Sequence, residues 1–326
     1  MTKFKLFANF VFCVTIIFYG CDNEKIDTYD TLKPSEFIEG LTIDNYPIID
    51  GSTSTFPLNT IIASRLLGIN FKWVEGRELR HIEPNLNKNN RNRLFQQVRN
   101  SQTHQSFVNL INNKADIVLS ARRMSPDEKA IADAAGVTLI ETPIALDALV
   151  FIVNPNNPIH SLTTTQIQEI YMLNITNWNE VGGNDLRIQP FVRNPNSGSQ
   201  ELMELLVMKD LVMPWHPENW PELIQLSGMI PAIDEVAWDV TAICYTVFYF
   251  KEHMVVNAAR VKTIGIDGIY PDTETIRNRS YPFVTGVYVV IRSDLDKSSM
   301  AYKIYEWLQT EEGRQVIIES GYIPYN

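Results

Sequence analysis

Residues 50–55 read Asp-Gly-Ser-Thr-Ser-Thr, and residues 193–199 read Arg-Asn-Pro-Asn-Ser-Gly-Ser. Each of these two loops follows a short apolar run and precedes a segment with helical periodicity, which predicts a strand–loop–helix turn. Such a turn points backbone N–H groups and hydroxyls at one place, at the positive end of a helix, and so forms a site for an anion. The two loops, with Arg193 at the start of the second, predict two lobes that close on one small anion.

Predicted strands and helices alternate along the rest of the chain. Apolar runs predict strands at 46–49, 116–120, 137–140, 148–153 and 187–192. Helical spacing or a capping residue predicts helices at 58–66, after 125, at 163–171 and from 201. This alternation implies parallel sheets in an α/β fold. The polar segment 71–100 breaks the pattern, and we expect an extended, solvated excursion there.

The first 21 residues have the order of an export signal. Two lysines precede an apolar run over 6–19, and Gly20-Cys21 follows. This order resembles a bacterial lipoprotein signal, so we expect a signal peptide over 1–20, lipid attachment at Cys21 and a tether over 21–40. An uncleaved membrane helix is disfavoured, because the apolar run is shorter than the ~20 residues that span a bilayer. We therefore expect an exported protein held by lipid in a bacterial cell envelope, with the choice of membrane left open.

The composition argues against several classes of function. A net charge of −10 provides no basic surface for nucleic acid, although N–H dipoles can still hold a small anion at short range. Cys244 would be the one free cysteine after export and lipidation, so no internal disulfide is predicted. The five histidines form no metal-binding pattern, and no Gly-x-Ser-x-Gly elbow is present. We therefore predict neither an enzyme nor a metal or cofactor site.

One stretch carries a specific resemblance. It covers residues 170–183 and includes the sequence Ile-Thr-Asn-Trp-Asn-Glu-Val-Gly-Gly. It resembles a characteristic stretch of the phosphate-binding proteins of ABC importers, which have the type II periplasmic binding protein fold. Further matches follow in that family's order, at 50–54, 115–122, 193–199, 281–282, 313 and 321–324.

This resemblance implies an architecture. We expect an α/β protein of two Rossmann-like lobes joined by two crossover strands, one at 146–153 and the other at 283–291. Lobe 1 would comprise 41–145 plus 281–326, and lobe 2 would comprise 146–280.

The resemblance also implies the ligand and the residues that bind it. The matching positions are Ser52, Thr53, Ser54, Ser120, Arg122, Arg193, Ser197, Gly198 and Ser199. The expected protein is a monomeric solute-binding lipoprotein that captures a small oxyanion, with inorganic phosphate as the expected ligand, between its lobes for an ABC permease. The alternative left open is a ligand-sensing or adhesive lipoprotein of the same fold with no transport role.

Two positions depart from the family's pattern. Ala121 stands where classical members have an Asp that accepts a hydrogen bond from protonated phosphate, while Arg122 adds a donor. Pro195 or a neighbour stands where an acid supports the ligand arginine. A site with more donors and fewer acceptors leaves open a more ionised anion, a carboxylate or a phosphorylated compound as ligand. Thr103-His104 is a further candidate donor, although a helix-capping Thr also explains that pair.

Overall fold

The computed structural model describes residues 35–214 and 223–325. The predicted signal peptide 1–20, Cys21 and most of the predicted tether 21–40 lie outside the described residues. Within the described ranges, the helices are all too short or too polar to cross a bilayer.

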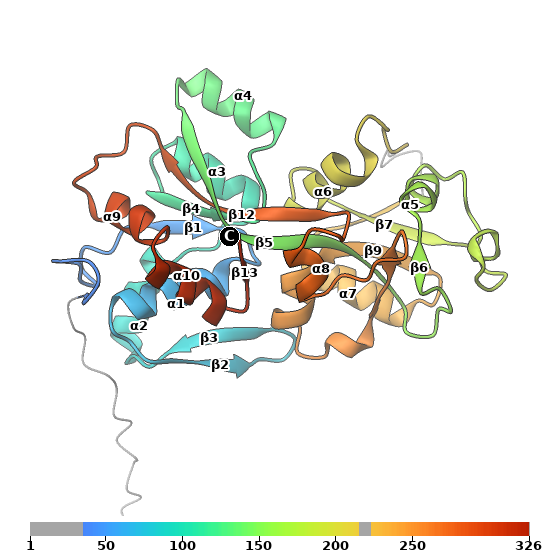
Figure 1. Cartoon of the computed structure of the whole chain (residues 1–326), viewed down its shortest axis with the longest axis horizontal. Helices are drawn as coiled ribbons and strands as arrows, with labels where there is room; N and C mark the ends of the chain where they lie inside the picture. The colour runs from blue at the N-terminus through green and yellow to red at the C-terminus, as the bar shows by residue number, and fades with distance from the viewer. Residues whose placement is uncertain (1–34, 215–222, 326) are drawn as a thin grey trace, which may run out of the picture.

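A single mixed sheet of nine strands runs through the molecule (Figure 1), and seven of them form its main path in the order β1-β4-β12-β5-β9-β7-β8. Along this path the strands are β1 (Ile49–Gly51), β4 (Ile117–Ser120), β12 (Val284–Arg292), β5 (Leu139–Val153), β9 (Ala242–Val247), β7 (Gln189–Arg193) and β8 (Ile224–Leu226). The pairs β1–β4, β7–β8 and β7–β9 are parallel, as the alternation predicts. The sheet is mixed, however, because β12 pairs antiparallel with β4 and β5, and β5 pairs antiparallel with β9.

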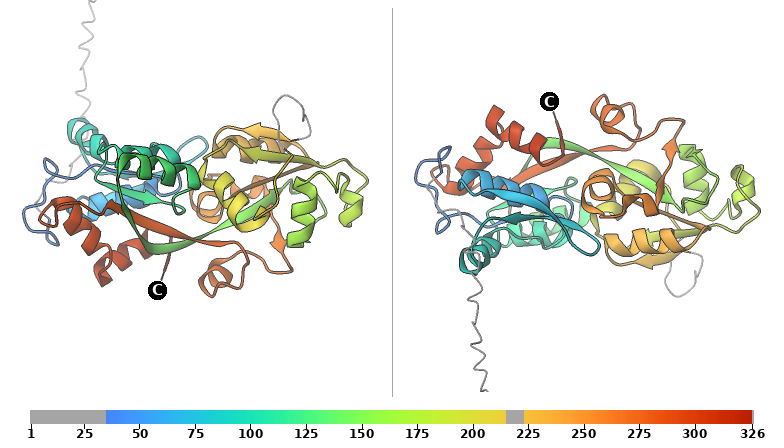
Figure 2. Two further views of the ribbon diagram at one scale, coloured as in Figure 1. Left: turned by 90° about the horizontal axis from the view of Figure 1, so that it is seen from above. Right: turned by 90° about the horizontal axis from the view of Figure 1, so that it is seen from below.

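The long strand β5 connects the two ends of the sheet. Residues 139–148 pair with β12, and Leu149–Val153 pair with β9. The two strands predicted at 137–140 and 148–153 are thus parts of one strand of 15 residues. Figure 2 shows β5 and β12 running side by side through the middle of the molecule, where the crossover strands are expected.

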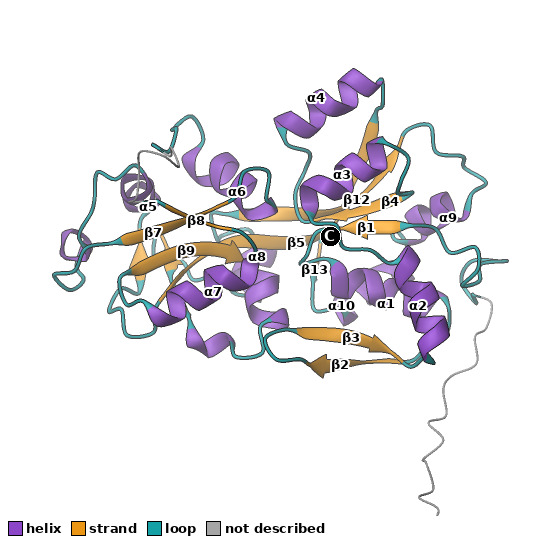
Figure 3. Cartoon of the chain, turned by 180° about the vertical axis from the view of Figure 1, so that it is seen from behind, coloured by secondary structure: helices purple, strands orange, loops and turns teal. Residues whose placement is uncertain are grey.

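Helices lie on both sides of the strands in each half of the molecule (Figure 3). The half that contains β1 and β4 has α1 (Phe56–Leu66), α2 (Lys88–Gln97), α3 (Thr103–Ile111), α4 (Pro126–Ala135), α9 (Met300–Trp307) and α10 (Glu311–Glu319). The half that contains β7 and β9 has α5 (Thr164–Tyr171), α6 (Gly198–Leu202), which continues into a π-helical segment at Met203–Met208, α7 (Met229–Trp238) and α8 (Thr273–Arg277). We call these halves lobe 1 and lobe 2; the boundaries predicted at 145/146 and 280/281 stay a prediction.

Short elements complete both lobes. In lobe 2 these are β6 (Ser161–Leu162), β10 (Lys262–Thr263), β11 (Gly265–Ile266), the 3-10 turns Trp178–Val181 and Ala258–Arg260, and the π-helical turn Phe250–Met254. At the C-terminal end, β13 (Ile323–Pro324) returns to pair antiparallel with residues 145–146 of β5.

The segment 71–100 is mostly exposed or half-buried, as expected of a solvated excursion, but it has regular secondary structure. It forms a hairpin of β2 (Phe71–Glu75) and β3 (Arg80–Pro84), followed by α2. Leu94 is fully buried, so this polar segment still contributes to the core. The tip of the hairpin reaches lobe 2, where the Glu78 carbonyl accepts a hydrogen bond from the Val256 N–H at 3.0 Å. The sequence of this segment has no strong apolar pattern. Its hairpin is held by the pairing of β2 with β3.

The stretch 170–183 serves the core of lobe 2. Asn177 caps the 3-10 turn in a capping box with Glu180, and Trp178 is buried. The Trp178 indole N–H donates to the Thr241 carbonyl at 2.9 Å, which ties this turn to the start of β9. The residues that make the stretch recognisable therefore hold the fold of the lobe, and they do not line the cavity described below.

Candidate functional site

A cavity of about 240 Å³ lies between the two lobes, and both serine-rich loops line it. Its walls come from the loop before α1, the start of α3, the residue after β4, the loop between β7 and α6, the start of α7 and the end of β9. Seven of the nine predicted ligand residues line it: Ser52, Thr53, Ser54, Arg193, Ser197, Gly198 and Ser199. The other lining residues are Gln102, Thr103, His104, Gln105, Ala121, Asn194, Pro195, Asn196, Gly228, Met229 and Val247. Among the described residues, no Asp or Glu lines the cavity.

The lobe 1 wall is held by buried hydrogen bonds. The Ser52 hydroxyl accepts the Ala121 N–H at 3.0 Å and pairs with the Thr103 hydroxyl at 2.8 Å. Behind the loop, the buried Asp50 carboxylate accepts the Ser101 N–H and the Asn109 side-chain amide, each at 2.8 Å. These bonds fix the loop relative to β4 and α3, so its hydroxyls face the cavity in a set geometry.

The lobe 2 wall contains a buried cation. Arg193 is only 4 % exposed and stands at the end of β7. Its Nε donates to the Leu226 carbonyl and its Nη1 to the Ser199 hydroxyl, both at 3.1 Å. Within residues 35–214 and 223–325, no carboxylate lies within ion-pair distance of this guanidinium, and burial lowers its pKa. A buried charge without a counter-ion is costly, so the site favours a negatively charged guest.

The two walls touch at Gly198. A Cβ atom at this position would lie 2.8 Å from Thr103 Oγ1, which is closer than side-chain atoms approach one another. Glycine therefore allows the loop of lobe 2 to lie directly against the start of α3 in lobe 1. The lobes are in contact here, and the cavity is closed on this side.

The family is recognisable by comparison with known proteins. A family model described as "PBP superfamily domain" matches residues 81–312, more than half of the chain. The chain belongs to the PBP superfamily. This membership and the mixed α/β architecture confirm the predicted type II periplasmic binding protein fold.

The chain is similar to several named relatives. The chain is 22% identical over 284 residues to a phosphate-binding protein PstS of Pseudomonas aeruginosa, covering 82% of each chain. It is 23% identical over 217 residues to the protein of that name from Borreliella burgdorferi, covering 66% of this chain and 74% of that one. The structure of an ABC-type phosphate transport receptor from Vibrio cholerae matches with a TM-score of 0.58 at 23% identity, covering 85% of this chain and 99% of that one. This structural match shows a shared fold.

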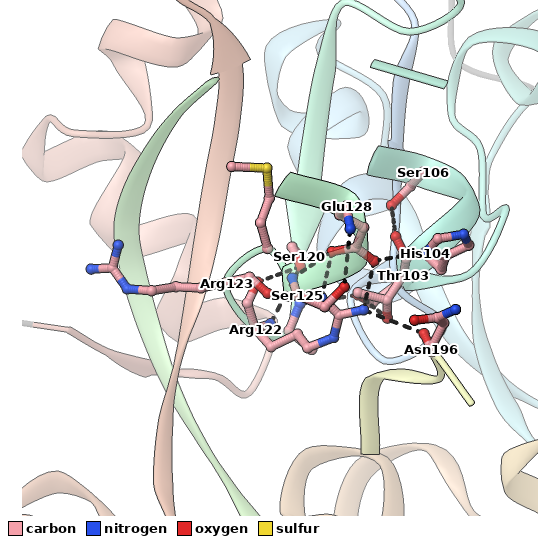
Figure 4. Close-up of polar contacts among 12 residues, drawn as sticks. Thr103, His104, Ser106, Ser120, Arg122, Arg123, Ser125, Glu128 and Asn196 are labelled. Atoms are coloured by element: carbon pink, nitrogen blue, oxygen red, sulfur yellow. Dashed lines mark hydrogen bonds and ion pairs between the residues drawn. The ribbon is translucent and has the colours of Figure 1, made fainter. Parts of the chain in front are cut away.

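Two predicted ligand residues, Ser120 and Arg122, do not line the cavity of this PBP superfamily member. The Ser120 hydroxyl is buried and donates to the Arg122 carbonyl at 2.6 Å. The Arg122 guanidinium makes two bonds of 2.7 Å to the Glu128 carboxylate, which neutralises its charge inside the protein (Figure 4). Its Nη2 also donates to the Asn196 carbonyl at 3.3 Å, so Arg122 links lobe 1 to the loop of lobe 2. Direct contact of either residue with a ligand stays a prediction.

Glu128 is the residue of this region that sequence analysis missed. The sequence Ser-Pro-Asp-Glu predicts an N-terminal helix cap at residue 125, and the structure has this cap as a capping box of Ser125 and Glu128 at the start of α4. The fully buried carboxylate also binds Arg122 and lies 3.1 Å from His104 Nδ1. Only the fold brings these three side chains together, so no local pattern could have shown this role.

Thr103 has another role than the expected helix cap. The N-cap of α3 is Gln102, which adopts a positive φ of 69°. Thr103 is the first residue of the helix, and its buried hydroxyl faces Ser52 and Gly198. Thr103 and His104 both line the cavity, as the candidate-donor interpretation required.

Proposed function

We propose that this protein is an exported substrate-binding protein that captures inorganic phosphate between its lobes and delivers it to an ABC importer. The observation that carries the proposal is Arg193, a buried cation without a carboxylate partner that faces a cavity lined by hydroxyl groups. The names of the relatives, phosphate-binding protein PstS and ABC-type phosphate transport receptor, support phosphate as the anion. The chain spans about three quarters or more of the two PstS proteins.

The arrangement suits capture by closure. The hydroxyls of residues 52–54 come from lobe 1, and Arg193 and Ser199 come from lobe 2. An anion gains both sets of contacts only when the lobes are together, so its binding shifts the population towards the closed form. β5 and β12, which run between the lobes, are the expected hinge strands.

The remaining features of the proposal concern chemistry and location. We infer passive binding without turnover, because among the described residues no lining serine or threonine hydroxyl is hydrogen-bonded to a histidine or carboxylate that could take its proton. We infer lipid attachment at Cys21, since Lys-rich, apolar and Gly-Cys segments follow one another at the N-terminus. The lipid would keep the binding protein close to a permease in the membrane, and a monomer suffices because the cavity is complete within one chain.

Calorimetry of ligand-stripped protein with phosphate tests the proposal. Wild-type protein should bind one phosphate per chain, and Arg193→Ala should lose at least about a hundredfold in affinity, because hydrogen bonds to a charged group in a buried site are strong. The matched control is Arg277→Ala, which removes an exposed arginine of the same lobe that pairs with Glu274. Absence of phosphate binding by the wild type, or unchanged binding by Arg193→Ala, would refute the proposal.

A further inference from the structure

We propose that Nε2 of His104 is the hydrogen-bond acceptor for the proton of hydrogen phosphate in this cavity, and that it thereby favours hydrogen phosphate over sulfate. The inference rests on the proposed function. Hydrogen phosphate and sulfate are tetrahedral anions of equal charge, and in this inference one side chain distinguishes them.

A hydrogen phosphate dianion carries one O–H that needs an acceptor, whereas sulfate carries none. Carboxylates accept without donating, but among the described residues none lines the cavity. Other lining hydroxyls and amides, such as those of Thr53 and Gln102, can act as donor or acceptor by rotation. They therefore adapt to either anion and do not distinguish between them.

Glu128 fixes the tautomer of His104. The Glu128 carboxylate is fully buried and accepts two hydrogen bonds from Arg122 and one from the Ser125 N–H, at 2.7–2.8 Å. A carboxylate in these surroundings acts as an acceptor, so His104 Nδ1, which lies 3.1 Å from its Oε1, must carry the hydrogen. In the neutral ring Nε2 then has a lone pair and no hydrogen.

His104 lines the cavity as the second residue of α3, directly after Thr103. Its Nδ1 edge is turned to Glu128, which is not a lining residue (Figure 4). The Nε2 edge is the other polar edge of the ring, and the part of the chain that the structure describes provides no partner for it. Nε2 is thus free for a ligand that enters between the lobes.

A fixed acceptor forms a hydrogen bond with the P–O–H group but places its lone pair against an oxygen of sulfate, which has no proton to donate. Glu128 is the positioning residue, since it holds the ring in the accepting tautomer. The position of the Glu128 carboxylate depends in turn on its two hydrogen bonds from Arg122. The buried ion pair of Arg122 and Glu128 therefore influences the cavity through His104, although neither residue lines it.

Two substitutions of His104 test the assignment. In His104→Asn the amide can still donate to Glu128 near the Nδ1 position but leaves nothing at Nε2, whereas in His104→Gln the amide reaches the Nε2 position. Phosphate and sulfate affinities would be measured by calorimetry at about pH 8, where phosphate is mainly the dianion. We expect His104→Asn to weaken phosphate binding about tenfold or more with sulfate unchanged or stronger, and His104→Gln to recover part of the loss. His160→Asn, at an exposed histidine, is the matched control.

A second measurement needs no variant. In nitrogen NMR of the wild type, His104 Nε2 should have the shift of an unprotonated ring nitrogen and should move on addition of phosphate but not of sulfate. An equal effect of His104→Asn on both anions, no effect on either, or a protonated Nε2 would overturn the inference while leaving phosphate capture intact. Failure of the wild type to bind phosphate would instead refute the proposed function, and the inference with it.

Discussion

Gly198→Ala tests whether the two walls of the cavity must touch for the anion to be held. The new Cβ would lie 2.8 Å from Thr103 Oγ1 and 3.7 Å from Thr103 Cβ. The second distance is ordinary contact, so the strain falls on the hydroxyl alone. That hydroxyl pairs with the Ser52 hydroxyl at 2.8 Å, and turning it away would break this bond. The methyl group therefore opposes the closed arrangement specifically.

The magnitude follows from the cost of such overpacking. Extra methyl groups at tight contacts cost about 1–3 kcal/mol, which corresponds to a loss of affinity for phosphate of about 5- to 150-fold. Thr103→Ala removes the oxygen that clashes and leaves the 3.7 Å carbon–carbon contact. Gly198→Ala should therefore reduce the affinity for phosphate much less in the Thr103→Ala variant than in the wild type.

Calorimetry with phosphate on the wild type, both single variants and the double variant forms a complete double-mutant cycle. Thermal unfolding without phosphate provides the control for folding, and Gly198→Ala should change it little because the lobes can separate. Unchanged affinity of Gly198→Ala would show that the walls need not touch. Purely additive losses in the double variant would show that Thr103 is not the obstacle.

Three further predictions concern stability. Burial raises the pKa of the Asp147 carboxyl to about 7, so the folded protein holds this proton more tightly than the unfolded chain and its free energy of unfolding should fall as pH rises from about 4 to about 7. Asp147→Asn should flatten that part of the profile in urea unfolding, and an unchanged profile would contradict the assignment. Arg122→Ala should lower the free energy of unfolding by about 3–5 kcal/mol, because it leaves the buried Glu128 carboxylate without its cation; a loss below about 1 kcal/mol in urea unfolding would contradict a buried pair. Trp178→Phe should lower the free energy of unfolding, measured by thermal unfolding, by about 1–3 kcal/mol, because the hydrogen bond to the Thr241 carbonyl is lost. The affinity for phosphate should stay the same, and weaker phosphate binding would show that this turn also shapes the cavity.

Local features were predictable because neighbouring residues determine them. The start of α4 is an example, since Ser125 and Glu128 form their capping box within one turn. The two strand–loop–helix turns are another, and seven of the nine residues predicted from them and from the resemblance meet around one cavity. In such cases the residue types and their spacing carry the information directly.

Features that depend on distant strands were not predictable. The mixed pairing of the sheet arises because β12, from the end of the chain, inserts between β4 and β5. The hairpin at 71–84 has few apolar residues, and its partner in lobe 2 is Val256, far along the chain. Apolar periodicity reports whether a segment is buried, but it does not report which strand lies beside it.

By itself, the sequence determined the chemistry that this protein can offer: hydroxyls and N–H groups at two turns, with an arginine beside one of them. Only the tertiary structure decided which cation is available. Arg193 and Arg122 are both buried, yet Glu128 neutralises one and no described carboxylate neutralises the other. The reason is that electrostatic pairing depends on distances between side chains, and folding sets those distances across segments that sequence spacing does not relate.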